Sequence, residues 1–144
     1  MGAGGAAVST VHASCVALDG RAALILGRSG AGKSALCLEM MARGAGLVAD
    51  DRVRLWREGG TVMAEAPTPI KGLIEARGVG LLHAPPVGPA AVALVVDLDV
   101  EETQRLPPER QRDVLGLSLP LCHKSVHGHF PAALIVYLQG GRYA

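Results

Sequence analysis

The residues with the most specific chemistry form a glycine-rich run from Gly27 to Ser34, with the sequence Gly-Arg-Ser-Gly-Ala-Gly-Lys-Ser. The run matches the phosphate-binding loop (P-loop) pattern G-x-x-x-x-G-K-[ST] at every fixed position. Its glycines let successive backbone N–H groups turn inward to bind an anion, and a helix that begins near Lys33 points the positive end of its dipole at that anion. The Lys33 ammonium can reach the β- and γ-phosphates of a nucleotide, and the Ser34 hydroxyl can bind Mg²⁺. The predicted nucleotide-binding residues are Gly27, Arg28, Ser29, Gly30, Ala31, Gly32, Lys33, Ser34 and Ala35.

Two adjacent acids, Asp50 and Asp51, follow a short predicted strand over Leu47–Ala49. Ligands of open α/β sheets bind at the carboxyl ends of strands, so these acids are placed to meet the phosphates. Neighbouring side chains on an extended chain point to opposite faces, so at most one of the two acids faces the γ-phosphate directly. Paired carboxylates raise one another's pKa, which suits a general base. The alternative is a pair of acids that caps a turn.

Other candidate residues have weaker signals. Asp97 ends the run Ala-Leu-Val-Val-Asp, so it is either a second acid at the metal or a capping acid on the surface. His12 stands beside apolar residues, which by itself is typical of a structural histidine. A histidine-rich segment has spacing that resembles a zinc site, but we expect a basic loop that faces phosphate or a partner. Its members are Cys122, His123, His127 and His129.

Hydrophobic patterning and turn residues predict the elements that hold the P-loop. A strand over Val11–Leu18 ends at Asp19-Gly20, a strong hairpin turn, and leads into a buried strand over Ala22–Leu26. Strong helix formers run from Lys33 to Arg43, and Gly44 ends the helix. The loop is therefore flanked by a strand and a helix, which is the arrangement that binds phosphate.

Later elements follow from the same signals. Three further strands are expected, of which the first two form a hairpin: Arg52–Arg57, Thr61–Ala66 and Ala91–Val96. Pro107-Pro108 predicts a short helix that begins at Glu109, and residues 119–129 are predicted to be irregular. Residues 131–139 predict a helix, with a strand as the alternative because several of them are β-formers.

The composition sets the class of protein. The chain has 144 residues, of which 49% are hydrophobic and 19% charged, and this indicates one globular domain. Lys and Arg number 14 against 13 Asp and Glu, a balance that excludes a polybasic nucleic-acid-binding protein. Aromatic residues make up only 3%, which excludes a protein that binds single-stranded nucleic acid by stacking aromatic side chains on bases. No apolar run reaches the roughly 18 residues of a membrane span. We expect residues 1–10 to be a flexible lead-in without a secretory signal, and residues 11–144 to be a single domain.

The number and spacing of the cysteines indicate the cellular compartment of the protein. Cys15, Cys37 and Cys122 are an odd and widely spaced set. Such a set indicates reduced, mostly buried thiols, which is typical of a cytoplasmic protein.

Four segments together resemble the catalytic domain of HPr kinase/phosphorylase, in a short form without an N-terminal domain. They are Val11-His12 before a hairpin, the P-loop from Gly27, Leu47–Val53 and Ile74–Gly80. The spacings between the first three agree with the family, and the resemblance covers most of residues 11–100. It implies an α/β P-loop kinase domain that resembles the nucleotide-binding part of phosphoenolpyruvate carboxykinase, with a mixed β-sheet and peripheral helices.

The family uses ATP and Mg²⁺ to phosphorylate a serine of a small phosphocarrier protein, HPr or its nitrogen-branch relative. Many members also remove that phosphate with inorganic phosphate, which yields pyrophosphate, and known assemblies are hexamers. The resemblance implies the same here. Asp51 would accept the serine proton, and Ser34 and Glu75 would bind Mg²⁺, which leaves Asp50 as a hydrogen-bonding acid. The implied catalytic residues are His12, Lys33, Asp51 and Arg77.

The sequence departs from the family pattern at three places. Ala35 stands where longer members have an acid, and Val114 stands where a catalytic arginine precedes Leu-Gly-Leu, so that Arg110 or Arg112 would have to substitute. The segment Cys122–His129 replaces an arginine- and glycine-rich stretch linked to dephosphorylation, which makes the forward reaction the better supported one. Two alternatives stay open: a P-loop kinase of a small molecule, and a non-catalytic module that senses nucleotides.

Overall fold

The computed structural model describes residues 7–144. Residues 1–6, the larger part of the predicted lead-in, lie outside the described residues. The first strand, β1 (Ser9–Val11), begins within the segment that the sequence assigned to the lead-in, because Ser9 and Thr10 pair with β5 (Val53–Glu58).

The centre of the molecule is a group of short apolar strands. The hairpin of β2 (Ser14–Leu18) and β3 (Arg21–Leu26) turns at Asp19 and Gly20, both with positive φ, as predicted. Residues 22–25 of β3 are all buried, which fits a strand covered on both faces. On its other side β3 runs parallel to β9 (Ala90–Glu101), which extends five residues beyond the predicted strand. The P-loop therefore starts beside the carboxyl-terminal part of β9.

The described strands form one nine-stranded mixed sheet and a separate hairpin. The sheet order is β1-β5-β6-β9-β3-β2-β4, with β4 (Gly46–Ala49) at one end. On its edge opposite β3, the long β9 pairs first with β6 (Thr61–Glu65) and then with β11 (Leu117–Lys124). The predicted hairpin of β5 and β6 and the predicted α/β fold class are confirmed.

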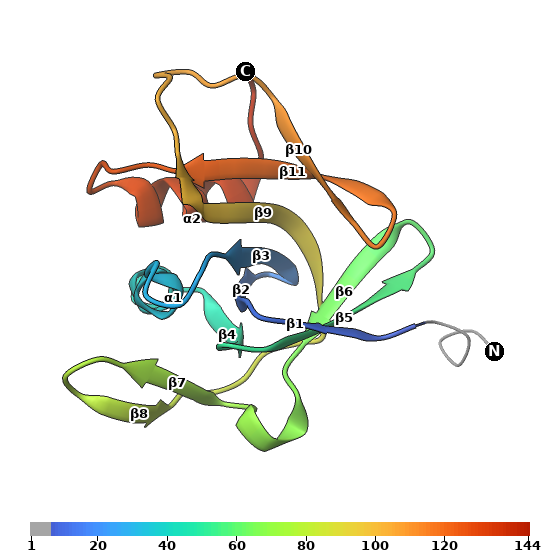
Figure 1. Ribbon diagram of the computed structural model, residues 1–144, viewed down its shortest axis with the longest axis vertical. Coiled ribbons are helices and arrows are strands. Elements are labelled where there is room, and N and C mark those ends of the chain that lie inside the picture. The colour runs from blue at the N-terminus through green and yellow to red at the C-terminus, as the bar shows by residue number, and fades with distance from the viewer. Residues whose placement is uncertain (1–6) are drawn as a thin grey trace.

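Two helices cover one face of the sheet. In Figure 1, α1 (Lys33–Met41) and α2 (Phe130–Gly140) lie on the same side of the central strands. Their apolar side chains, such as Met40 and Leu138, pack on Val16 and Ile25, while Cys15 and Leu24 point to a second core under β5 and β6. The helix predicted over residues 131–139 is confirmed. Within residues 7–144 no helix is both long and apolar enough to traverse a lipid bilayer.

The carboxyl-terminal third differs from the prediction. The short helix expected at Glu109 is wrong, because residues 110–114 form β10, and residues 117–124, largely expected to be irregular, form β11. These two strands pair with each other and β11 with β9, so partners far apart in the chain override weak local signals.

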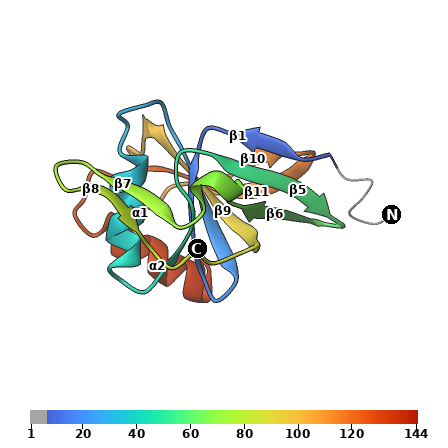
Figure 2. The ribbon, with the colours of Figure 1, turned by 90° about the horizontal axis from the view of Figure 1, so that it is seen from below.

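A second small sheet stands apart from the main one. It consists of β7 (Leu73–Ala76) and β8 (Gly80–His83), and it follows a short 3₁₀ turn over Thr68–Ile70. Figure 2 shows this hairpin beside α1, at the same end of the molecule as the P-loop. The hairpin brings Glu75 and Arg77 to the cavity beside the P-loop.

Candidate active site

The P-loop has the backbone that the glycines predict. It connects β3 to α1, and Gly27, Gly30 and Gly32 have φ values of 156°, 85° and 102°. A Cβ on Gly27 would lie 3.0 Å from the Cβ of Ala31 and 3.3 Å from that of Leu98, so a larger residue would push the loop off β9. Helix α1 begins directly after Gly32 without a side-chain cap, which leaves its first N–H groups directed at the loop.

Lys33 is the charged group of this loop. Its side chain is buried, and Nζ donates hydrogen bonds to the carbonyl oxygens of Gly27 at 2.7 Å and Arg28 at 3.2 Å. These bonds hold the ammonium against the loop and use two of its three N–H donors. The third can serve a phosphate oxygen in the adjoining cavity.

A cavity of about 510 Å³ opens beside the P-loop and α1. The structure brings together on its wall the six residues that the family resemblance implies as catalytic or metal-binding: His12, Lys33, Ser34, Asp51, Glu75 and Arg77. They come from four separate parts of the chain. Of the predicted nucleotide-binding residues, Ser29, Gly30, Gly32 and Ala35 also line the cavity.

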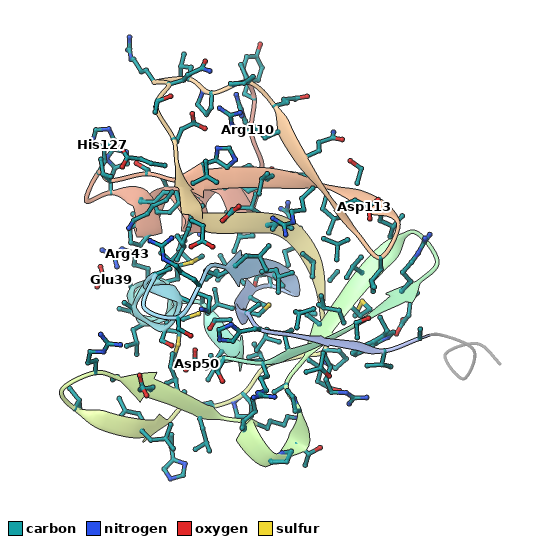
Figure 3. The ribbon with its side chains drawn as sticks, viewed as in Figure 1. Glu39, Arg43, Asp50, Arg110, Asp113 and His127 are labelled. Atoms are coloured by element: carbon teal, nitrogen blue, oxygen red, sulfur yellow. The ribbon has the colours of Figure 1, made fainter. Side chains whose placement is uncertain are left out.

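Asp50 is a buried hydrogen-bond centre behind this wall. Its Oδ1 accepts the hydroxyl groups of Ser34 at 2.6 Å and Ser14 at 2.8 Å, and its Oδ2 accepts the backbone N–H of Glu75 at 3.1 Å. Figure 3 shows Asp50 between α1 and the β7–β8 hairpin. One carboxylate thus fastens α1, β2 and β7 to one another. It also orients the Ser34 hydroxyl, since that proton points to Asp50 and the oxygen lone pairs remain for a ligand.

Asp51, in contrast to the buried Asp50, is exposed to solvent. Its side chain is 63% exposed, and Oδ1 lies 2.9 Å from Nε2 of His12. Its backbone has φ 71°, a left-handed conformation that is strained by about 1–3 kcal/mol in a residue other than glycine and is common at active sites. The Asp51 N–H donates to Oγ of Ser14 at 3.2 Å. A carboxylate held at a cavity mouth by a histidine can accept a proton from an incoming hydroxyl.

The donor atoms near the P-loop suit Mg²⁺. The Ser34 hydroxyl and the Glu75 carboxylate are oxygen ligands, which this ion prefers. In the described part of the chain no three His, Cys, Asp or Glu side chains gather in a way that could hold a metal. Mg²⁺ is commonly held by one or two protein oxygens together with substrate phosphates and water, and this wall offers such a pair.

Comparison with known proteins agrees with this geometry. Residues 5–114 match the family model described as HPr Serine kinase C-terminal domain. The chain belongs to this family. The resemblance stated from the sequence motifs is therefore confirmed.

Individual relatives are named HPr kinase/phosphorylase. The HPr kinase/phosphorylase of Geobacillus kaustophilus is 40% identical over 120 residues, which cover 78% of this chain and 37% of that protein. That of an Acidovorax species is 41% identical over 123 residues, which cover 76% of this chain and 39% of that protein. The chain thus spans well under half the length of these curated relatives.

A solved structure extends the likeness to nearly the whole fold. The structure of the HPr(Ser) kinase/phosphatase from Coxiella burnetii superposes with a TM-score of 0.76 at 25% sequence identity. The match covers 91% of this chain and 94% of that one, so the fold of the HPr kinase family reaches beyond the residues of the family model.

Asp97 does not lie on the wall of the P-loop cavity. Its Oδ1 accepts the N–H of Asp99 at 2.9 Å, and its Oδ2 lies 3.6 Å from Arg112, so the capping alternative describes it. Asp99, which sequence reasoning missed, instead accepts the N–H of Arg28 with both carboxylate oxygens at 3.1 Å. Asp99 thereby holds the first turn of the P-loop. Only the unexpected length of β9 brings it there, and no local signal indicates this.

The histidine-rich segment lies at a different place. His127 and His129 stack with ring centroids 5.4 Å apart and, with His123 and Cys122, line a second cavity of about 560 Å³. Three arginines, Arg105, Arg110 and Arg142, share this cavity and add positive charge to the histidine-rich segment. Arg110 and Arg112, named as substitutes for a missing catalytic arginine, are not on the wall of the P-loop cavity.

The cysteines match the expectation of free thiols. Cys15 and Cys37 are fully buried and Cys122 is partly buried, and none of the three is in a disulfide. Burial raises the pKa of each thiol above its ordinary value, which favours the protonated form.

Proposed function

We propose that this chain transfers the γ-phosphoryl group of ATP to a serine of an HPr-like phosphocarrier protein. The observation that carries the proposal is that Asp51 and His12 share one cavity with Lys33, Ser34 and Glu75. A base for a hydroxyl group thus faces the residues suited to phosphates and Mg²⁺. Membership of the HPr kinase family, and relatives named HPr kinase/phosphorylase, support a serine of HPr as the acceptor.

The chemical step follows from these positions. The Asp51 carboxylate takes the proton of the serine hydroxyl while the serine oxygen bonds to the γ-phosphorus. The bond from that phosphorus to the β–γ bridging oxygen breaks, and ADP leaves with the electron pair. Lys33 and the N–H groups at the start of α1 stabilise negative charge on the phosphates. Ser34 and Glu75 would hold Mg²⁺, which when bound neutralises further charge on the β- and γ-phosphates. Arg77, on the same wall, can stabilise the transferred group.

Two features support a protein rather than a metabolite as acceptor. The Asp51 side chain is 63% exposed at the cavity mouth, so a large molecule can present a hydroxyl there. Two apolar side chains of the β7–β8 hairpin, Val79 and Leu81, are 75% and 67% exposed beside it. Exposed apolar groups at a cavity rim are typical of a protein-binding surface.

Two further parts of the proposal rest on the family alone. They are assembly into hexamers and the reverse reaction, in which inorganic phosphate attacks the phosphoserine and Asp51 returns the proton to serine. A cytoplasmic location is supported by the free, mostly buried cysteines. The segment Cys122–His129 replaces the stretch linked to dephosphorylation, so the forward reaction is the better supported of the two.

The test is transfer to a purified HPr-like carrier with ATP and Mg²⁺, followed by mass spectrometry of the product. The proposal expects one phosphate on one serine, and loss of this product when Asp51 is replaced by Asn. Nucleotide binding without transfer to any carrier would contradict it, and so would faster transfer to a panel of small alcohols.

A further inference from the structure

We infer that Ser14 is a positioning residue that fixes the Asp51 base relative to the metal-binding end of the site. The inference rests on the proposed function, since it assigns Asp51 the proton. Ser14 lies at the start of β2, is fully buried, and lines the P-loop cavity. It belongs to none of the motifs that identify the family in this sequence.

One hydroxyl group makes both connections. Oγ of Ser14 donates to Oδ1 of Asp50 at 2.8 Å and accepts the N–H of Asp51 at 3.2 Å. The directions are fixed by chemistry, because a carboxylate only accepts and a backbone N–H only donates. Ser14 therefore bridges two adjacent residues whose side chains point in different directions.

The bridge links the two halves of the site. On one side, Asp50 also binds the hydroxyl of Ser34 and the N–H of Glu75, the two residues suited to Mg²⁺. On the other side, the Asp51 backbone has φ 71°, a conformation that persists only when its surroundings hold it. Ser14 holds the main chain of Asp51, and His12, two residues earlier, holds its side chain. A short stretch of chain entering β2 thus fixes the base at two points.

Removal of the Ser14 hydroxyl should affect the position of Asp51 more than the contacts of Asp50. In Ser14→Ala, Asp50 keeps its bonds to Ser34 and Glu75, so binding of ATP and Mg²⁺ persists. Asp51 loses its backbone tether and moves relative to the γ-phosphate. Misplacement of a reacting group by about 1 Å can cost on the order of 100-fold in rate. We expect kcat to fall by about 10- to 100-fold, and KM for ATP to change less than about 3-fold.

The experiment compares three variants with the wild-type chain. Ser14→Ala removes the hydroxyl, and Ser14→Thr keeps it and should recover most of kcat. Cys15→Ala is the matched control, because Cys15 is the next residue of β2, equally buried, and belongs to the core on the other face of the sheet. Thermal unfolding of each variant separates a loss of fold from a loss of position. Amide hydrogen exchange at Asp51 in the chain without substrates reports the bond to Ser14 independently of transfer.

The outcomes are distinct. The inference predicts that Ser14→Ala lowers kcat and speeds exchange at the Asp51 amide, while Ser14→Thr and Cys15→Ala change both much less. Unchanged exchange at Asp51 in Ser14→Ala, or an equal fall of kcat in Cys15→Ala, would overturn it. If the wild-type chain transfers no phosphate, the proposed function fails, and exchange at Asp51 still decides whether Ser14 fastens that residue.

Discussion

Asp50 and Asp51 are adjacent in the chain, but their carboxylates make separate sets of contacts. Asp50 is buried and accepts hydrogen bonds from Ser14, Ser34 and the backbone of Glu75. Asp51 is exposed and contacts His12 at the cavity mouth. Since the two carboxylates have opposite surroundings, replacement of each by the corresponding amide should have a different result.

Asp51→Asn removes the base and leaves the P-loop intact. We expect transfer to fall by about 10²- to 10⁴-fold, the usual contribution of a general base. The affinity for ATP and the midpoint of thermal unfolding should change little, because Asp51 is exposed and lies outside the contacts of Lys33. Titration calorimetry with ATP and a transfer assay measure the two effects. A variant that retains full transfer would remove Asp51 from the mechanism.

Asp50→Asn should instead act on the fold and on metal binding. One amide group cannot accept from Ser14, Ser34 and Glu75 as the carboxylate does, and a buried polar group left unpaired costs about 1–3 kcal/mol. We expect the free energy of unfolding to fall by about this amount, and the Mg²⁺ concentration needed for half-maximal transfer to rise. Asp113→Asn is the control, because Asp113 is an exposed residue of β10 whose carboxylate accepts the N–H of Gly116. Equal stability of the two variants in urea unfolding would contradict the role given to Asp50.

The exposed tip of the β7–β8 hairpin should contribute to binding of the carrier protein, whereas Glu75 and Arg77 of the same hairpin serve Mg²⁺ and the phosphates. Val79→Asp places a charge on the exposed apolar tip, so KM for the carrier should rise by about 10-fold, which corresponds to about 1.4 kcal/mol of binding free energy. KM for ATP should rise less than KM for the carrier, because Val79 lies at the exposed tip of the hairpin. Val8→Asp is a matched control, since Val8 is also an exposed valine but is not on the wall of the P-loop cavity. An unchanged KM for the carrier in Val79→Asp would show that the hairpin does not contact it.

The Glu102–Arg110 pair should make stability depend on acid pH. Two hydrogen bonds from Arg110, at 2.9 Å and 3.0 Å, lower the pKa of Glu102 from its ordinary 4.5 to about 2. A carboxyl group whose pKa is lowered by folding stabilises the fold above its unfolded pKa, and this contribution is lost as pH falls toward the folded value. Glu102→Gln should therefore unfold at a lower temperature than the wild-type chain at pH 7.

The difference between the two unfolding temperatures should shrink between pH 4.5 and pH 2. Glu109→Gln, an exposed residue of the same segment, should show no such pH-dependent difference. A constant difference for Glu102→Gln over this range would contradict the pKa assignment.

Much of the site could be predicted because its signals are local. The P-loop, the strand before it and the helix after it lie in one continuous run, and Asp50 and Asp51 follow a short apolar strand. The role of Asp50 depends on Ser14 and Glu75, which are 36 and 25 residues away in the chain. Only the pairing of β2 with β4 and the position of the β7–β8 hairpin bring these residues together.

The carboxyl-terminal strands could not be predicted for a similar reason. Pro107-Pro108 and the charged residues after it resemble the start of a helix, and Pro120 is unusual inside a strand. Strand β11 forms because β9 offers it a parallel edge, and β10 forms because β11 is there to pair with. The same long β9 explains why Asp99, and not Asp97, holds the P-loop.

The most direct test of the account is a crystal structure of the chain with a non-hydrolysable ATP analogue, Mg²⁺ and the carrier protein. The account predicts the γ-phosphate beside Lys33 and Ser34, with the serine oxygen about 3–3.5 Å from the γ-phosphorus. An Asp51 carboxylate oxygen should lie about 2.6–3.2 Å from that serine oxygen. An Asp51 side chain turned away from the serine, or a γ-phosphate bound outside this cavity, would contradict it.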